Sequence, residues 1–238
     1  MGDSQDFGSV ISLLSKYYCC LAVDLPGHGK TRVIGDEICY NMSNTAQALI
    51  RLLDDLQIDK CLLLGYSMGG RLALYMTLHF PDRFERVVLE SASPGLKTKA
   101  ERSHRFQADL QLAQKLENSN IKEFLLSWYD RPLFQSLKNS PKFDRLIEAR
   151  LTNNPIELAK SLRNMGTGNQ PSLWKQLGQN QIPLLLLAGE YDDKFTTINT
   201  EIASLCPAAS LKIIPKTGHN IHWENIELFV EIVRQFYD

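Results

Sequence analysis

Short apolar runs alternate with stretches of helical spacing along most of this 238-residue chain. Continuous apolar strands separated by helices are typical of a parallel sheet that is buried on both faces. The pattern therefore predicts an α/β fold with a mostly parallel sheet and helices on both faces. The predicted strands are residues 17–24, 60–67, 86–91, 182–192 and 211–216, and the predicted helices are residues 44–58, 69–79, 196–205 and 224–236.

Residues 94–176 differ from the rest of the chain. They contain no apolar run of strand length and are rich in Lys, Arg, Gln and Asn at helical spacing. We expect a helical insertion there that covers the sheet as a lid. The chain then divides into a first part of the α/β core (1–93), a helical lid (94–176) and a second part of the core (177–238).

Composition narrows the classes of function. Lys and Arg number 26 against 27 Asp and Glu, so the net charge of −1 provides no long-range field for nucleic acid. No apolar stretch approaches the roughly 18 residues of a membrane span. The five cysteines show no C-x-x-C spacing, which favours a reducing cytoplasm and argues against a cysteine metal site. We expect no cofactor, and an anionic substrate would need local positive charge.

The sequence Gly65-Tyr66-Ser67-Met68-Gly69 has the G-x-S-x-G pattern of a nucleophile elbow. The pattern is weak alone, but here it follows a predicted strand and opens a predicted helix. Flanking glycines permit the tight turn that exposes the serine hydroxyl. The backbone N–H of Met68 then faces any oxygen that gains negative charge at this point.

A nucleophilic or basic serine needs a histidine and an orienting acid. Asp192 and His219 each follow one of the last two predicted strands, at the sheet edge where ligands of parallel sheets bind. Asp193 is the alternative acid, because spacing alone leaves the choice open. His222 forms H-x-x-H with His219, which is not a zinc-helix motif, so no metal is expected. His28 lies in a polar segment where solvent exposure is expected.

The chain resembles the α/β-hydrolase superfamily through DLPGHG, GYSMGG, GEYDDKF and GHNIHWEN, which occur in the expected order. It is most similar to the 2-succinyl-6-hydroxy-2,4-cyclohexadiene-1-carboxylate synthases of menaquinone and phylloquinone biosynthesis. That closer similarity is carried by Arg71, by Arg102 and Arg105, and by the runs ESASPGL, WYDRPLF and RLTNN. These motifs extend over nearly the whole chain.

The resemblance implies a lyase that removes pyruvate from an enolpyruvyl cyclohexene carboxylate, with the triad of Ser67, Asp192 and His219 acting as a base. It implies an oxyanion contact at the Met68 N–H and leaves Phe134 undecided between a pocket wall and the lid core. The implied substrate-binding residues are Tyr66, Arg71, Arg105, Trp128, Tyr129, Arg150 and Lys194.

The chemistry of these residue types fits a substrate with three carboxylates. Arg71 lies one helical turn beyond Ser67, and Lys194 lies two residues beyond Asp192. Arg105 and Arg150 come from the predicted lid, and arginine binds carboxylates through two parallel hydrogen bonds. Arg102 is expected to be a solvated neighbour.

One departure from the family pattern and two alternatives stay open. Family members begin with further strands, the last of which ends in His-Gly-Phe, whereas this sequence begins at Met1-Gly2-Asp3. We therefore expect an incomplete oxyanion site and a start that precedes Met1. A hydrolase acting on an ester or carbon–carbon bond, or a non-catalytic binding module, would keep the same fold. We expect a monomer or weak homo-oligomer with a small anionic substrate.

Overall fold

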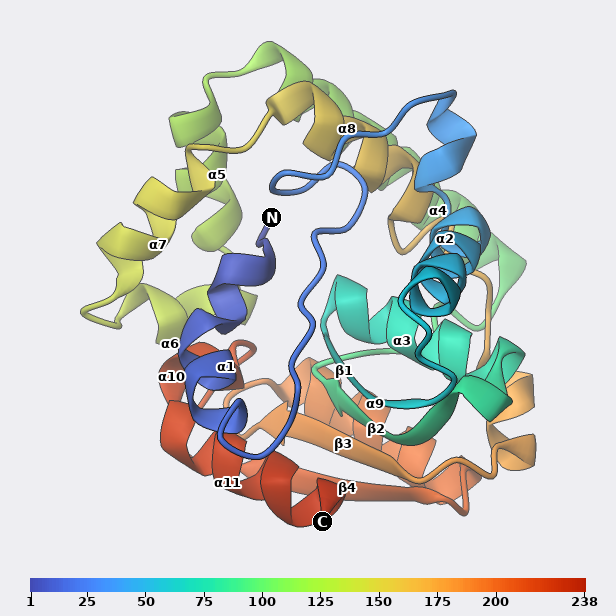
Figure 1. The fold of residues 1–238 in the computed structure, drawn as a ribbon. Helices are drawn as coiled ribbons and strands as arrows, with labels where there is room; N and C mark the ends of the chain where they lie inside the picture. Colours follow the sequence, from blue (N-terminus) through green and yellow to red (C-terminus); the bar gives the residue numbers. More distant parts are fainter.

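A four-stranded parallel sheet organises the molecule, and the computed structural model describes residues 1–238. Its strands are β1 (Cys61–Tyr66), β2 (Phe84–Glu90), β3 (Leu184–Gly189) and β4 (Ala209–Ile214). They lie in the order β1-β2-β3-β4, and every neighbouring pair is parallel. All four carboxyl ends therefore meet at one edge, as Figure 1 shows. The predicted α/β class is confirmed.

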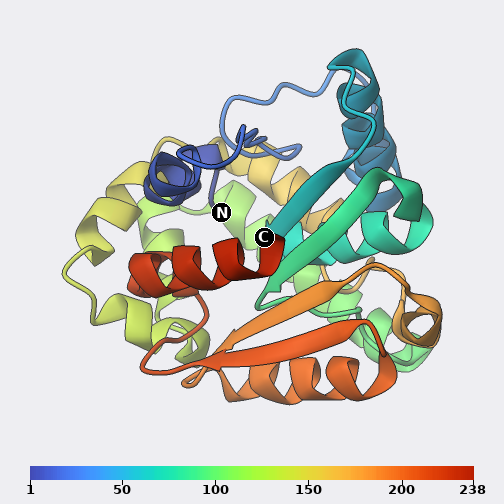
Figure 2. The same ribbon diagram turned by 60° about the horizontal axis from the view of Figure 1, so that its bottom comes forward.

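Alternating side chains of the strands fill two separate cores. In β2, Val87 and Leu89 pack on one face, whereas Val88 packs on the other. The first face is covered by α2 (Met42–Asp55), α3 (Met68–His79) and α9 (Asp193–Leu205). The second face is covered by α1 (Gly8–Leu14), α10 (Ile221–Glu224) and α11 (Ile226–Tyr237). Figure 2 shows α9 and α11 on opposite sides of the sheet.

Several predicted helix ends differ from the observed ones because side chains cap them. The helix predicted over 44–58 is α2, which begins earlier because the Asn41 side chain accepts the Asn44 N–H at 2.7 Å. The helix predicted over 196–205 is α9, whose first turn is capped by Asp192. The last predicted helix begins two residues later than expected, after the Asn225 cap.

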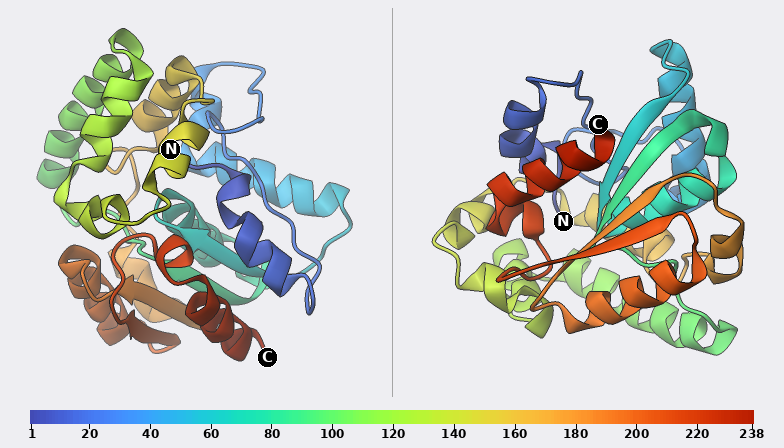
Figure 3. Two further views of the ribbon diagram at one scale, coloured as in Figure 1. Left: turned by 90° about the vertical axis from the view of Figure 1, so that its left-hand side faces the viewer. Right: turned by 90° about the horizontal axis from the view of Figure 1, so that it is seen from below.

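Between β2 and β3 the chain forms only helices. They are α4 (Lys99–Asn118), α5 (Ile121–Tyr129), α6 (Gln135–Lys138), α7 (Phe143–Arg150) and α8 (Pro155–Met165), with short 3-10 turns η4 (Pro132–Phe134) and η5 (Trp174–Gln179). A capping box between Thr98 and Glu101 starts α4. Figure 3 shows these helices as a layer apart from the sheet. None of the helices combines the length and apolar character needed to cross a bilayer.

The remaining short elements belong to the N-terminal half. They are the 3-10 turns η1 (Ser4–Phe7), η2 (Glu37–Tyr40) and η3 (Pro81–Arg83). Residues 15–36 connect α1 to η2 as a long loop, visible in blue in Figure 1.

The strand predicted over residues 17–24 is wrong. From Cys19 to Asp24 the segment has no regular secondary structure and belongs to no sheet. Its apolar side chains are partly in solvent, with Leu21 55% exposed and Val23 37% exposed. An apolar run becomes a strand only when a neighbouring strand accepts its backbone hydrogen bonds, and β1 pairs with β2 alone.

Candidate active site

Ser67 occupies a sharp turn between β1 and α3. Its backbone has φ 49° and ψ −108°, an unfavourable region for a residue with a side chain. The turn is held from both sides, because the Ser67 N–H donates to the Glu90 carbonyl at 2.8 Å and the Ser67 carbonyl accepts from the Arg71 N–H at 2.9 Å. Strain maintained in this way is characteristic of a nucleophile elbow.

A hydrogen-bonded chain joins Ser67, His219 and Asp192 at the carboxyl ends of β1, β3 and β4. Nε2 of His219 lies 3.0 Å from the Ser67 hydroxyl, and Nδ1 lies 2.6 Å from Oδ2 of Asp192. With Nδ1–H donating to the Asp192 carboxylate, Nε2 carries a lone pair toward the serine proton. The arrangement can therefore act as a general base.

The two adjacent aspartates have different surroundings. Asp192 is 3% exposed, and its second oxygen accepts the Phe195 N–H at 3.2 Å. Asp193 is exposed in the first turn of α9. The structure thus brings Asp192, and not Asp193, to the imidazole.

The loop that carries His219 is fastened to the end of β2 by two residues that the sequence reasoning did not single out. The Ser91 hydroxyl donates to the His219 carbonyl at 3.0 Å. The buried Glu90 carboxylate accepts the His222 N–H at 3.1 Å and lies 2.8 Å from Nδ1 of His222. Their only sequence signal was the run ESASPGL. These contacts fix the height of His219 above the sheet.

The Met68 N–H lies beside Ser67 as predicted from the motif. Met68 is the first residue of α3, so its N–H has no acceptor within the helix and is directed out of the helix N-terminus. A developing negative charge above Ser67 would meet this donor and the positive end of the helix dipole.

Three of the four predicted cations lie close enough to influence one another. Arg71 is 9% exposed and donates to Oε1 of Gln170 at 3.0 Å. Burial, followed by the charge of Arg105, lowers the pKa of Arg71 to about 10. Desolvation also lowers the pKa of Lys194, and Arg105 is the next cause. Arg105 donates through Nε to Asp109 at 2.7 Å.

Arg150 is bound differently from the other cations. Its guanidinium makes a bidentate pair with the Asp6 carboxylate, at 2.7 and 2.6 Å, and its Nε donates to the Tyr129 hydroxyl at 3.3 Å. Burial opposes its charge, but Tyr129 and Asp6 hold the pKa of Arg150 above its ordinary value. The fork predicted to bind a substrate carboxylate is occupied by a carboxylate of the chain itself.

Aromatic side chains surround the imidazole of His219. Tyr66 and Phe134 lie 5.4 and 5.7 Å from it between ring centroids, and Phe134 meets it edge-on. Burial, and then Glu90, raises the pKa of Tyr66. Trp128 lies 6.2 Å from Phe134, so it belongs to the same aromatic wall. Phe134, which the sequence left undecided, therefore contacts the site directly.

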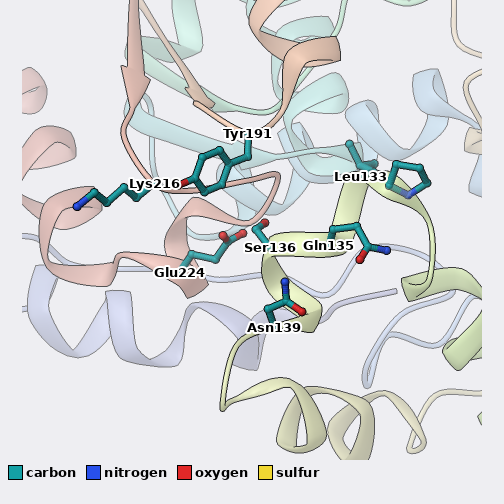
Figure 4. A pocket seen from close by; sticks show the side chains of 8 residues that line it. Leu133, Gln135, Ser136, Asn139, Tyr191, Lys216 and Glu224 are labelled. Carbon is teal, nitrogen blue, oxygen red and sulfur yellow. The ribbon is translucent and has the colours of Figure 1, made fainter.

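A polar cavity of about 400 Å³ lies on the outer side of the His219 loop. Figure 4 shows Glu224 and Ser136 facing each other within it, with Tyr191 and Lys216 nearby. Glu224 accepts the Gly218 N–H at 2.9 Å, and burial raises the pKa of its carboxyl. None of the triad lines this cavity, so it is not the reaction site. No group of three His, Cys, Asp or Glu side chains converges to hold a metal ion.

Comparison with known proteins agrees with this fold. The chain belongs to the α/β-hydrolase family, because the model of the alpha/beta hydrolase fold matches residues 1–226. Within that family, a Bacillus subtilis (strain 168) protein is 40% identical over 91% of this chain and 80% of its own length. It carries the provisional name 2-succinyl-6-hydroxy-2,4-cyclohexadiene-1-carboxylate synthase.

Two further relatives agree with this similarity. The 2-succinyl-6-hydroxy-2,4-cyclohexadiene-1-carboxylate synthase of Serratia proteamaculans (strain 568) is 34% identical over 91% of this chain and 82% of that protein. Among solved structures, MenH from S. aureus superposes with a TM-score of 0.94 at 37% identity, covering 98% of this chain and 88% of that one. The family resemblance drawn from the motifs is confirmed.

Proposed function

We propose that this protein is a carbon–oxygen lyase. It eliminates pyruvate from 2-succinyl-5-enolpyruvyl-6-hydroxy-3-cyclohexene-1-carboxylate and releases 2-succinyl-6-hydroxy-2,4-cyclohexadiene-1-carboxylate. The names of relatives at 40% and 34% identity support this reaction. The observation that carries the proposal is the hydrogen-bonded Ser67–His219–Asp192 chain beside a group of cations that suits a polyanion.

The bond changes of this reaction need a base and no water. Because a 3-ene becomes a 2,4-diene, the proton leaves C2 and the enolpyruvyl oxygen leaves C5. The Ser67 oxygen takes the C2 proton as its own proton passes to Nε2 of His219. The C–H electron pair forms the C2=C3 bond, the ring double bond shifts to C4=C5, and the C5–O bond breaks. The leaving pyruvate enolate receives the proton held by His219.

Charge stabilisation follows from the position of α3. Loss of the C2 proton places negative charge on the succinyl ketone oxygen, and the Met68 N–H is the donor that this chain provides beside Ser67. The substrate carboxylates would pair with cations around the pocket. Arg71 belongs to the core helix α3, and Arg105 belongs to the lid helix α4.

The first prediction tests this function and the role of the triad. The purified protein should release pyruvate and a conjugated diene in equal amounts from the enolpyruvyl substrate. Ser67→Ala and His219→Ala should each lower kcat by at least about a thousandfold, since the members of a triad act as a unit. Pyruvate is measured by coupled NADH oxidation and the diene by its ultraviolet absorbance.

The hydrolase alternative predicts a different result when ester cleavage and diene formation are both measured. Rapid cleavage of p-nitrophenyl esters, with no diene formed from the enolpyruvyl substrate, would favour it over the lyase. Near-normal turnover by a folded Ser67→Ala protein would contradict the assigned base.

We also expect the enzyme to work in the cytoplasm. We expect it to be a monomer or weak homo-oligomer, and a sedimentation experiment checks this oligomeric state.

A further inference from the structure

Arg131 is a half-buried cation with no anionic partner. It lies between α5 and η4 in the lid, and its guanidinium carbon is 4.1 Å from the centre of the Trp128 ring. The other partly or fully buried arginines of the lid are all bound to oxygen atoms. Those pairs are Arg102 with the Leu96 and Lys97 carbonyls, Arg105 with Asp109, Arg150 with Asp6, and Arg163 with Glu37 and Glu117.

A short chain of aromatic rings connects Arg131 to the base. Trp128, which carries the guanidinium on its face, lies 6.2 Å from Phe134, and Phe134 meets His219 edge-on at 5.7 Å. Arg131 therefore belongs to the same wall as the catalytic imidazole. It lies at the lid end of this wall, and His219 lies at the other end.

Electrostatics place Arg131 with the other cations of the site. Arg105 lowers the pKa of Arg131, of Arg71 and of Lys194, in each case together with desolvation. Arg105 is thus near enough to act on three further positive groups, after desolvation, which is the largest cause in each case. The nearby Asp109 is already bound by Nε of Arg105 and by the Gly168 N–H at 2.9 Å. Mutual repulsion of this kind favours binding of an anion.

The partners of Arg150 can be compared directly with those of Arg131. The sequence assigned it to a substrate carboxylate, but both of its terminal nitrogens are bound to Asp6. A substrate with three carboxylates then lacks one of its three expected arginines. The terminal nitrogens of Arg131 make no hydrogen bond, whereas both terminal nitrogens of Arg150 are bound to Asp6.

We propose that Arg131 is a further substrate ligand, which binds a carboxylate of the enolpyruvyl substrate beside Arg71 and Arg105. Stacking on Trp128 fixes the plane of the guanidinium, so little freedom is lost when two parallel hydrogen bonds form. This inference rests on the proposed function, because that substrate supplies the three carboxylates.

The experiment compares Arg131→Gln with the unaltered protein in the pyruvate assay. We expect KM to rise about 10- to 100-fold, the loss of a charge-assisted contact, with kcat changed by less than about threefold. Arg131→Lys should recover only part of the loss, because an ammonium cannot make the bidentate contact. Arg145→Gln is the matched control, since Arg145 is an exposed arginine of the same lid, and its KM should not change.

A second readout separates binding from folding. In the Ser67→Ala background, which lacks the base, Arg131→Gln should weaken binding of the intact enolpyruvyl substrate by a similar factor in calorimetry, while the thermal midpoint stays within a degree or two. Kinetic constants of Arg131→Gln within twofold of those of an active unaltered protein would overturn the inference and leave the lyase standing. A KM that rises equally in Arg145→Gln would also overturn it. No pyruvate from the unaltered protein would instead overturn the function, and this inference with it.

Discussion

Asp192 and Asp193 are chemically identical neighbours with different surroundings. Asp192 is buried against the imidazole, whereas Asp193 is exposed at the start of α9. Asp192→Asn should lower kcat by about 10⁴, because an amide no longer holds Nδ1–H toward itself and His219 loses the correct tautomer. Asp193→Asn should leave kcat within about twofold in the pyruvate assay. A larger loss at Asp193 would show that the acid had been assigned to the wrong residue.

At the scale of single residues, the sequence predicted the serine and the order of its partners, because each follows a strand whose apolar run is easily recognised. It left Asp192 and Asp193 open, since a strand end fixes position only to within a residue. Glu90 and Arg131 were missed for another reason. Glu90 meets His222 across 132 positions of sequence, and Arg131 stands out only when the oxygen partners of the other lid arginines are known. Neither relation has a local pattern.

At the scale of elements, the elbow depends on two close approaches of backbone. A Cβ on Gly65 would lie 2.5 Å from the Gly69 carbonyl oxygen, and one on Gly70 would lie 2.6 Å from the Ala92 side chain. A Cβ on Gly69 would meet nothing within 4 Å. Gly65 and Gly70 therefore allow α3 to begin directly against β1 and β2, while the last glycine of the motif is not required by packing.

Gly65→Ala and Gly69→Ala form a matched pair that tests this. Gly65→Ala should destabilise the protein by about 1–3 kcal/mol, because the turn must open to admit the methyl group. Gly69→Ala should be neutral or stabilise α3 by up to about 1 kcal/mol, since alanine is the better helix former. Urea unfolding gives both values. Equal losses at the two positions would mean that the motif's glycines are needed for flexibility and not for space.

The same scale explains where the predicted elements were wrong. Four of the five predicted strands are present, because each pairs with a neighbouring strand; β2 and β3 in the middle are largely buried, and β1 and β4 at the edges are partly exposed. Residues 17–24 carry a similar run, but periodicity reports only which residues avoid water, not whether a neighbouring strand is available. The helix ends moved by a few residues because capping side chains, such as that of Asn41, set them.

At the scale of the whole molecule, long-range packing reversed the expectation for His28. The sequence placed it in a polar loop, but the structure leaves it only 6% exposed. Its loop lies against the lid, since a Cβ on the adjacent Gly27 would come within 2.5 Å of the Glu157 carbonyl of α8. Burial lowers the pKa of His28 to about 3. Joining the N-terminal loop to α8 therefore keeps one imidazole neutral at every physiological pH.

This burial predicts a specific loss of stability in acid. Below a pKa of about 6.5 the unfolded chain protonates His28, whereas the folded chain keeps it neutral down to a pKa of about 3. The unfolded state then binds more protons, so the free energy of unfolding falls by up to about 1.4 kcal/mol for each pH unit below 6.5. A His28→Gln variant lacks this contribution. We subtract the free energy of unfolding of His28→Gln from that of the unaltered protein. This difference should fall by about 2 kcal/mol between pH 7 and pH 5.

Urea unfolding at pH 7, 6 and 5 measures this difference directly. Other titrating groups contribute equally to both proteins, so subtraction isolates His28. His104→Gln is the control, because His104 is exposed on α4, and its curve should run parallel to that of the unaltered protein. If the His28→Gln curve also runs parallel, then His28 becomes protonated within the fold. The loop of residues 25–31 would then open toward solvent in acid while the sheet and lid stay folded.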